Sequence, residues 1–93
     1  MSAVALNRTM TEVRKFIEEE LISGRIEKFD DGTDLIEQGV IDSLSLIRLV
    51  TFLEQVCQIQ VPDEEIVPNN FRSVSAIQAF VAGQESAKAH QGN

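Results

Sequence analysis

Ser43 is the residue whose surroundings most suggest chemistry, because it stands between Asp42 and Leu44 at the start of a run with helical periodicity. A serine in such a place is commonly an N-cap, whose hydroxyl accepts a hydrogen bond from an orphan backbone amide. It could instead be a nucleophile or a site of covalent modification. The N-cap is the commonest of these roles, so either functional interpretation needs support from the rest of the chain.

A nucleophilic role for Ser43 requires a neighbouring base and a site for an oxyanion. The only histidine, His90, lies in the C-terminal tail, and the cations nearest in sequence, Lys28 and Arg48, are not plausible bases without special burial. A Ser–His–Asp arrangement is therefore excluded. We assign no catalytic residue and expect no enzymatic activity, so any chemistry at Ser43 would be its own modification.

Acidic side chains upstream of this serine raise the question of a calcium site. They are Asp30, Asp31, Asp34 and Glu37. If Gly32 is taken as the sixth position of an EF-hand loop, however, Phe29 becomes the third position and Gln38 the twelfth, and neither suits calcium coordination. We therefore predict a solvated acidic loop and no metal site.

The charge of the chain favours basic protein partners. Fifteen acidic residues against eight basic ones give a net charge of −7 at pH 7. This balance repels phosphate backbones and anionic membrane surfaces, so we expect no nucleic-acid partner. The acidity is concentrated between Glu27 and Glu65, where ten acids face two bases. A basic partner would therefore be steered toward Ser43.

Length and cysteine usage indicate one small domain in a reducing compartment. The 93 residues, 43% of them apolar, suffice for a single compact core. Cys57 is alone, so it cannot form an internal disulfide, and it lies at a core position of a predicted helix. The chain shows no secretory signal, and no apolar run approaches the ~20 residues that span a bilayer. We expect a cytoplasmic monomer without membrane insertion.

Apolar periodicity predicts an all-α fold. Side chains at helical spacing predict three substantial helices, at residues 10–23, 43–58 and 73–83. A shorter helical piece is expected at residues 63–67. The connection at residues 24–42 is too irregular for a helix, but its aliphatic side chains should pack on the core. The expected architecture is a small four-helix bundle with a long loop between its first two helices.

Local signals also predict caps and boundaries. We expect Asp42 or Ser43 to cap the second main helix, Asp63 to cap the short helix and Ser73 to cap the last one. The folded domain should span residues 9–82, between a flexible arm at residues 1–8 and a disordered tail at residues 83–93.

Four segments carry a family resemblance. Residues 35–44 (LIEQGVIDSL) resemble the phosphopantetheine-attachment region of acyl carrier proteins, and residues 46–54 (LIRLVTFLE) resemble that family's recognition helix. Residues 59–64 (IQVPDE) are similar to its loop into a short third helix, and residues 71–74 (FRSV) to the entry of its last helix. The similarity extends over residues 9–82.

The resemblance implies that a separate phosphopantetheinyl transferase attaches 4′-phosphopantetheine covalently to Ser43. The thiol of that arm would hold an acyl group as a thioester, and the helix N-terminus would favour the phosphate. Partner recognition is expected at Asp42, Leu44, Ile47 and Arg48. The implied partners are the transferase, an acyl- or aminoacyl-activating ligase, and a downstream acyltransferase or synthase.

The attachment region departs from the fatty-acid-synthesis members in two ways. Those members place one residue between the loop glycine and Asp-Ser-Leu, whereas Val40 and Ile41 both intervene here. They also follow Ser-Leu with an acid, whereas this chain has Ser45, and residues 44–57 contain one base and one acid. The spacing is closer to stand-alone D-alanyl and aminoacyl carriers, which indicates a discrete carrier in a specialised pathway.

Two alternatives remain open on the sequence alone. The cargo could be an acyl group or an aminoacyl group loaded by a dedicated ligase. The chain could also be an unmodified helical adaptor that docks through Leu44 and Ile47, because both residues lie beside the apolar stripe of their helix.

Overall fold

The computed structural model describes the backbone of residues 3–91 and the side chains of residues 8–84. Within that part the chain is helical, without strands. Its elements are α1 (Ala3–Phe16), a π-helical segment η1 (Ile17–Ile22), α2 (Ser43–Cys57), a 3₁₀ turn η2 (Asp63–Glu65), α3 (Pro68–Phe71) and α4 (Val74–Gln91). The prediction of an all-α bundle with three main helices and a short one is confirmed. The short helix itself was placed too early: residues 63–67 hold only the 3₁₀ turn, and the short α-helix is Pro68–Phe71.

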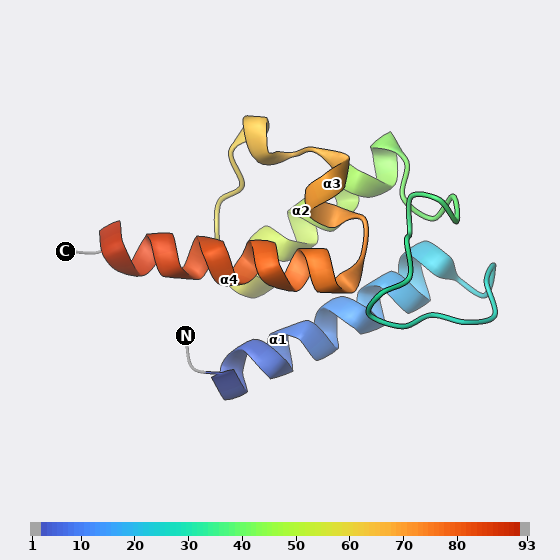
Figure 1. Cartoon of the computed structure of the whole chain (residues 1–93), viewed down its shortest axis with the longest axis horizontal. Helices are drawn as coiled ribbons and strands as arrows, with labels where there is room; N and C mark the ends of the chain where they lie inside the picture. The colour runs from blue at the N-terminus through green and yellow to red at the C-terminus, as the bar shows by residue number, and fades with distance from the viewer. Residues whose placement is uncertain (1–2, 92–93) are drawn as a thin grey trace.

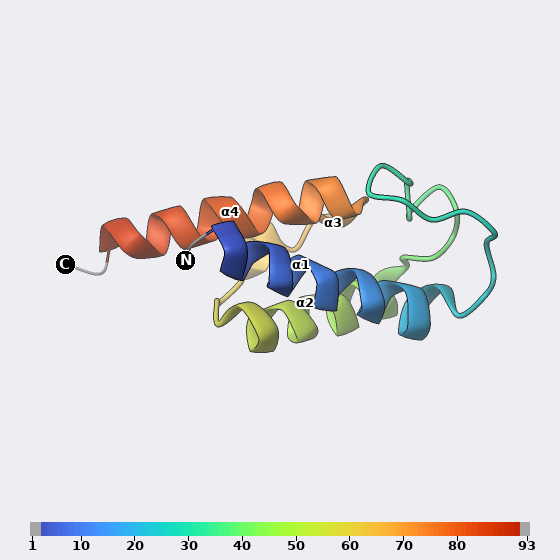
Figure 2. The same ribbon diagram turned by 90° about the horizontal axis from the view of Figure 1, so that it is seen from below.

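The three long helices lie lengthwise against one another (Figure 1). In both views α1 begins and α4 ends at the same end of the bundle, and the long connection from η1 to α2 lies at the opposite end (Figures 1 and 2). Helices α1 and α2 run antiparallel, so η1 lies near the first turn of α2 (Figure 2). Phe16 and Phe52 join the two helices with stacked rings whose centroids are 4.3 Å apart.

The core is built from the apolar stripes of all three long helices. The fully buried side chains include Val13 and Ile17 from the first helical stretch, Leu49 and Leu53 from α2, and Ile77 and Val81 from α4. Cys57 is 1% exposed, which confirms its predicted core position. No buried side chain in the described part is polar or charged, so apolar burial supplies the main driving force for this fold.

Two helices are longer than predicted. Helix α1 begins at Ala3, where the sequence suggested a flexible arm, and α4 continues through Gly83 to Gln91, where it suggested a disordered tail. Both extensions are rich in alanine and other strong helix formers, and one interior glycine costs only about 1 kcal/mol relative to alanine. Residues 1–2 and 92–93 lie outside the described residues.

The cap predictions have opposite outcomes. Ser73 caps α4, since its Oγ accepts a hydrogen bond from the Ala76 amide at 3.1 Å. Asp63 was expected to cap the short helix, and this is wrong: Pro62 holds the cap position, makes no side-chain cap bond, and Asp63 is already inside the 3₁₀ turn. Pro62 fixes an extended backbone before the turn, and that geometry starts the turn one residue early.

None of the helices in the described part combines the length and the apolar character that a membrane span requires.

Two leucines of α2 offer a matched test of the core. Leu53 is fully buried and Leu44 is 72% exposed. We expect Leu53→Ala to lower the free energy of unfolding by about 2–5 kcal/mol, because it leaves a cavity. The same change at Leu44 should alter it by less than about 0.5 kcal/mol. Urea unfolding followed by circular dichroism measures both, and equal losses would contradict this description of the core.

Candidate functional site

The chain reaches Ser43 through a tightly packed turn. Gly39 adopts a left-handed backbone (φ 74°), and a Cβ built there would meet nothing within 4 Å, so the position requires glycine for its conformation and not for space. Val40 and Ile41 follow, and both are buried. These are the two residues that distinguish the spacing of this loop. Their burial anchors the chain immediately before Asp42 and Ser43.

Asp42, not Ser43, is the N-cap of α2. Its backbone is extended, and its Oδ1 accepts a hydrogen bond from the Ser45 amide at 2.9 Å. Ser43 is consequently the first residue of the helix, and it is exposed. Its side chain has no hydrogen-bond partner among the residues that the structure describes. Of the two expected cap residues, Asp42 holds the position and Ser43 does not, so the Ser43 hydroxyl is available for another role.

The same hydrogen bonding sets the charge beside Ser43. The Ser45 amide, followed by the Ser45 hydroxyl, donates to the Asp42 carboxylate and lowers its pKa below the ordinary aspartate value. Asp42 is therefore a fixed negative charge and a weak base at neutral pH. The amides of the first helical turn place a partial positive charge at the same corner.

The solvent face of α2 next to Ser43 is apolar with one cation. Leu44 and Ile47 are 72% and 52% exposed, which confirms that they lie beside the buried stripe. Arg48 is about half exposed, and its Nη2 lies 3.6 Å from Oε1 of Glu20 on η1. Sequence reasoning missed Glu20, because no local pattern indicates which segment lies beside Arg48. An exposed pair at this distance adds little stability.

Two ion pairs that sequence reasoning also missed tie the long connection to the helices. Arg14 on α1 donates two hydrogen bonds to Asp31, at 2.7 and 2.8 Å, and these lower the pKa of Asp31. Arg72 donates to Asp34 at 3.1 Å. The pKa of Asp34 is also lowered, mainly by the Glu37 amide that donates to it. The partners are 17 and 38 residues apart, too far for any helical or turn spacing to predict them.

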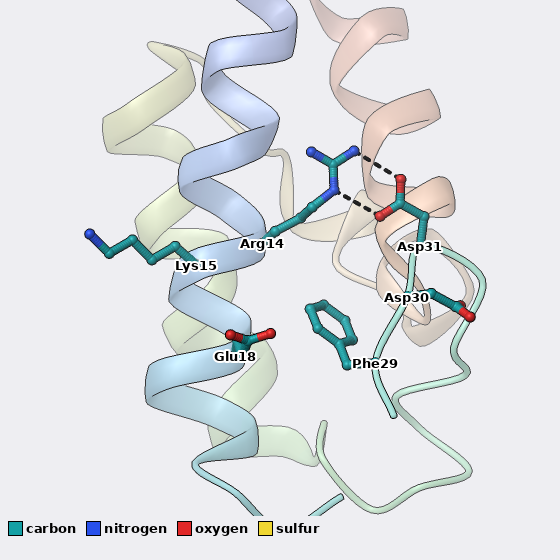
Figure 3. Close-up of a pocket in the computed structure, with 6 residues that line it drawn as sticks. All are labelled: Arg14, Lys15, Glu18, Phe29, Asp30 and Asp31. Atoms are coloured by element: carbon teal, nitrogen blue, oxygen red, sulfur yellow. Dashed lines mark hydrogen bonds and ion pairs between the residues drawn. The ribbon is translucent and has the colours of Figure 1, made fainter. Parts of the chain in front are cut away.

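A shallow cavity of about 210 Å³ lies between α1 and the long connection (Figure 3). It is lined by Arg14, Lys15, Glu18, Phe29, Asp30 and Asp31. The Arg14–Asp31 pair crosses one side of it, and none of the predicted site residues lines it. Within the described residues, no group of three or more histidine, cysteine or acidic side chains could hold a metal ion.

Fold and site together define a small helical protein that presents one free serine at the start of its second main helix. Residues 12–81 match the protein family described as "Phosphopantetheine attachment site". The chain is also 32% identical over 71 residues to the probable acyl carrier protein PigG of Serratia sp. (strain ATCC 39006), covering 76% of this chain and 78% of that protein. The chain therefore belongs to the acyl carrier protein family, whose members are carriers and not enzymes.

The covalent cofactor of this family is 4′-phosphopantetheine, and the residues at the α2 corner fit it. An exposed hydroxyl without a hydrogen-bond partner in the described part can be reached by another protein. The adjacent helix terminus favours a phosphate group. When bound, the group supplies a thiol that carries an acyl chain as a thioester.

The lowered aspartate pKa values predict acid sensitivity. Asp31, Asp34 and Asp42 bind protons less readily in the folded chain than in the unfolded chain. The free energy of unfolding should therefore be at its full value above about pH 4, the ordinary aspartate pKa, and should fall as the pH drops further. Urea midpoints measured from neutral to about pH 3 test this. Asp31→Asn should flatten the profile, and a pH-independent midpoint in the wild type would contradict the prediction.

Proposed function

We propose that Ser43 is the residue to which a phosphopantetheinyl transferase attaches the arm, and that the chain is a discrete acyl carrier in a specialised pathway. The observation that carries this proposal is the capping of α2 by Asp42, which leaves the Ser43 hydroxyl exposed and without a partner in the described part of the chain. A serine that served as the cap would have its oxygen engaged by the helix.

Ser43 is a better acceptor than the serine two residues further on. Ser45 is only partly exposed, and both its amide and its hydroxyl are directed to Asp42. Ser73 is likewise engaged, as the cap of α4. Among these three serines, only Ser43 combines a helix N-terminus with an unengaged hydroxyl.

The proposed attachment needs a base from the transferase. The Ser43 oxygen forms a bond to the phosphorus of coenzyme A that bears pantetheine, and the bond from that phosphorus to the bridging oxygen of the diphosphate breaks. Adenosine 3′,5′-bisphosphate leaves, and the serine hydroxyl loses its proton. Asp42 is the nearest carboxylate in sequence, but its lowered pKa makes it a poor proton acceptor. The carrier thus supplies the nucleophilic oxygen and its position, and the transferase supplies the base.

The face of α2 supports recognition by partners outside fatty-acid synthesis. Between residues 44 and 57 there is one base, Arg48, and one acid, Glu54, so the helix offers no acidic stripe. Leu44 and Ile47 provide the exposed apolar contact beside Ser43. We therefore propose that the transferase, an activating ligase, and a downstream acyltransferase or synthase bind through this face and Asp42.

Two cargo classes remain to be separated. The name of the relative from Serratia, a probable acyl carrier protein, favours an acyl group, whereas the loop spacing resembles aminoacyl carriers. Offering the pantetheinylated protein to ligases that activate fatty acids and to ligases that activate amino acids distinguishes the two classes, because the two kinds of thioester differ in mass.

A cytoplasmic location and a monomeric state remain part of the proposal.

A matched pair of serine variants tests the proposal directly. Incubation with a broad-specificity transferase and coenzyme A should add one phosphopantetheinyl group to the wild type and to Ser45→Ala, and none to Ser43→Ala. Intact-mass spectrometry reads the adduct, and circular dichroism confirms the fold. A modified Ser43→Ala protein would place the attachment on another residue and contradict the proposal. A folded wild type without an adduct would favour the unmodified adaptor that docks through Leu44 and Ile47.

The role of Arg48 can be tested by charge reversal. Arg48→Glu should change the loading rate with at least one transferase or ligase several-fold, because it removes the cation of the docking face. Stability should change by less than about 0.5 kcal/mol, as for most exposed positions. Arg8→Glu makes the same charge change at an exposed position within α1 and should leave every rate unchanged. Identical rates for both variants would contradict a recognition role.

A further inference from the structure

We propose that Arg72 is a positioning residue for Ser43: from the junction of α3 and α4 it fixes the segment that leads into α2. The inference rests on the proposed function, in which a transferase must reach the Ser43 hydroxyl. Arg72 is 29 positions away in the sequence (72 − 43) and belongs to no motif of the attachment region.

Arg72 holds the connection with both its side chain and its backbone. Its Nε donates to Asp34 Oδ2 at 3.1 Å, and its Nη1 donates to Asn69 Oδ1 at 2.7 Å. Its carbonyl oxygen accepts a hydrogen bond from the Leu35 amide at 2.7 Å. The guanidinium is thus oriented by Asn69 on α3 while it holds Asp34. Two neighbouring residues of the connection are fixed to one point of the bundle.

Hydrogen bonds within the segment from Asp34 to Ile41 connect the residues that Arg72 holds to the start of α2. Asp34 Oδ1 accepts from the amides of Ile36 and Glu37, at 3.1 and 3.0 Å. The Leu35 carbonyl accepts from the amides of Val40 and Ile41, at 2.8 and 3.0 Å. Residue 41 is covalently joined to Asp42, the cap of α2. A continuous set of bonds therefore connects Arg72 to the residue that precedes Ser43.

Burial holds this segment against the bundle. Leu35 is fully buried, and Val40 and Ile41 are 1% and 6% exposed. Asp34 and Arg72 are themselves partly exposed, with side-chain exposures of 27% and 42%. Loss of their ion pair should therefore affect overall stability little. It should instead increase the fraction of molecules in which the segment has moved. The apparent affinity for a transferase falls by the same factor as the fraction of molecules that keep the original arrangement.

The chain contains a natural control for this inference. Arg14 and Asp31 form a second arginine–aspartate pair between a helix and the same connection, with two bonds instead of one. Asp31 lies further from Ser43 along the chain, and, as at Arg72, a backbone hydrogen bond remains after the substitution: the Ser75 amide donates to the Asp31 carbonyl oxygen at 2.9 Å. Arg14→Met should therefore affect stability at least as much as Arg72→Met, without moving Ser43.

The experiment compares steady-state kinetics of the transferase on the unmodified full chain and its variants. Arg72→Met and Asp34→Asn should each raise KM for the carrier by at most about fivefold, the full effect of losing an exposed ion pair, with kcat unchanged. Arg72→Lys should give a smaller rise. Arg14→Met should leave KM unchanged. Amide exchange of Val40 and Ile41, followed by NMR, should accelerate in Arg72→Met but not in Arg14→Met.

The outcomes separate the possible failures. An unchanged KM in both Arg72→Met and Asp34→Asn would overturn the positioning role. So would an equal rise of KM in Arg14→Met and Arg72→Met when the two variants have the same melting temperature. If the wild type accepts no phosphopantetheine on Ser43, the proposed function fails instead. The exchange rates of Val40 and Ile41 then still decide whether Arg72 fixes the segment.

Discussion

The hydrogen bond from the Ser45 amide to the Asp42 carboxylate is the interaction on which the rest of the site depends. A helix N-terminus needs a side-chain oxygen for its first amides, and serine serves about as well as aspartate. Because Asp42 holds that position, Ser43 falls one residue inside the helix, with its hydroxyl exposed. The same bond lowers the pKa of Asp42. The availability of Ser43 and the absence of a strong base beside it therefore have one cause.

The long connection before α2 needs both burial and specific polar contacts to present that serine in one place. Complete burial of a leucine, valine or isoleucine side chain stabilises a fold by about 1.5–3 kcal/mol, so Leu35, Val40 and Ile41 supply most of the energy that holds the loop down. Exposed ion pairs contribute much less, but they are directional. The bonds of Arg14 and Arg72 thus determine where along the bundle the buried side chains enter it.

Sequence patterns could predict the helices and the candidate serine, but not what surrounds them. The stripe of α2 and the cap at Ser73 follow from local spacing, and both are present in the structure. The ends of α1 and α4 were wrong because cap and glycine signals are weaker than a run of strong helix formers. The Glu20–Arg48 and Asp34–Arg72 pairs join segments that only tertiary packing brings together, so no periodicity reveals them.

The placement of charge has a consequence for recognition under the proposed function. Helix α2 is nearly neutral, yet the chain has a net charge of −7. Three consecutive exposed glutamates, residues 18–20, lie on η1, and Glu20 lies 3.6 Å from Arg48 on α2. A partner that covers Leu44 and Ile47 therefore meets a cation on α2 and the Glu20 carboxylate on the neighbouring segment. A partner selected only for an acidic second helix would place its basic groups against Arg48, where like charges repel. Discrimination between partners would then depend on the antiparallel packing of α1 and α2, and not on the sequence of α2 alone.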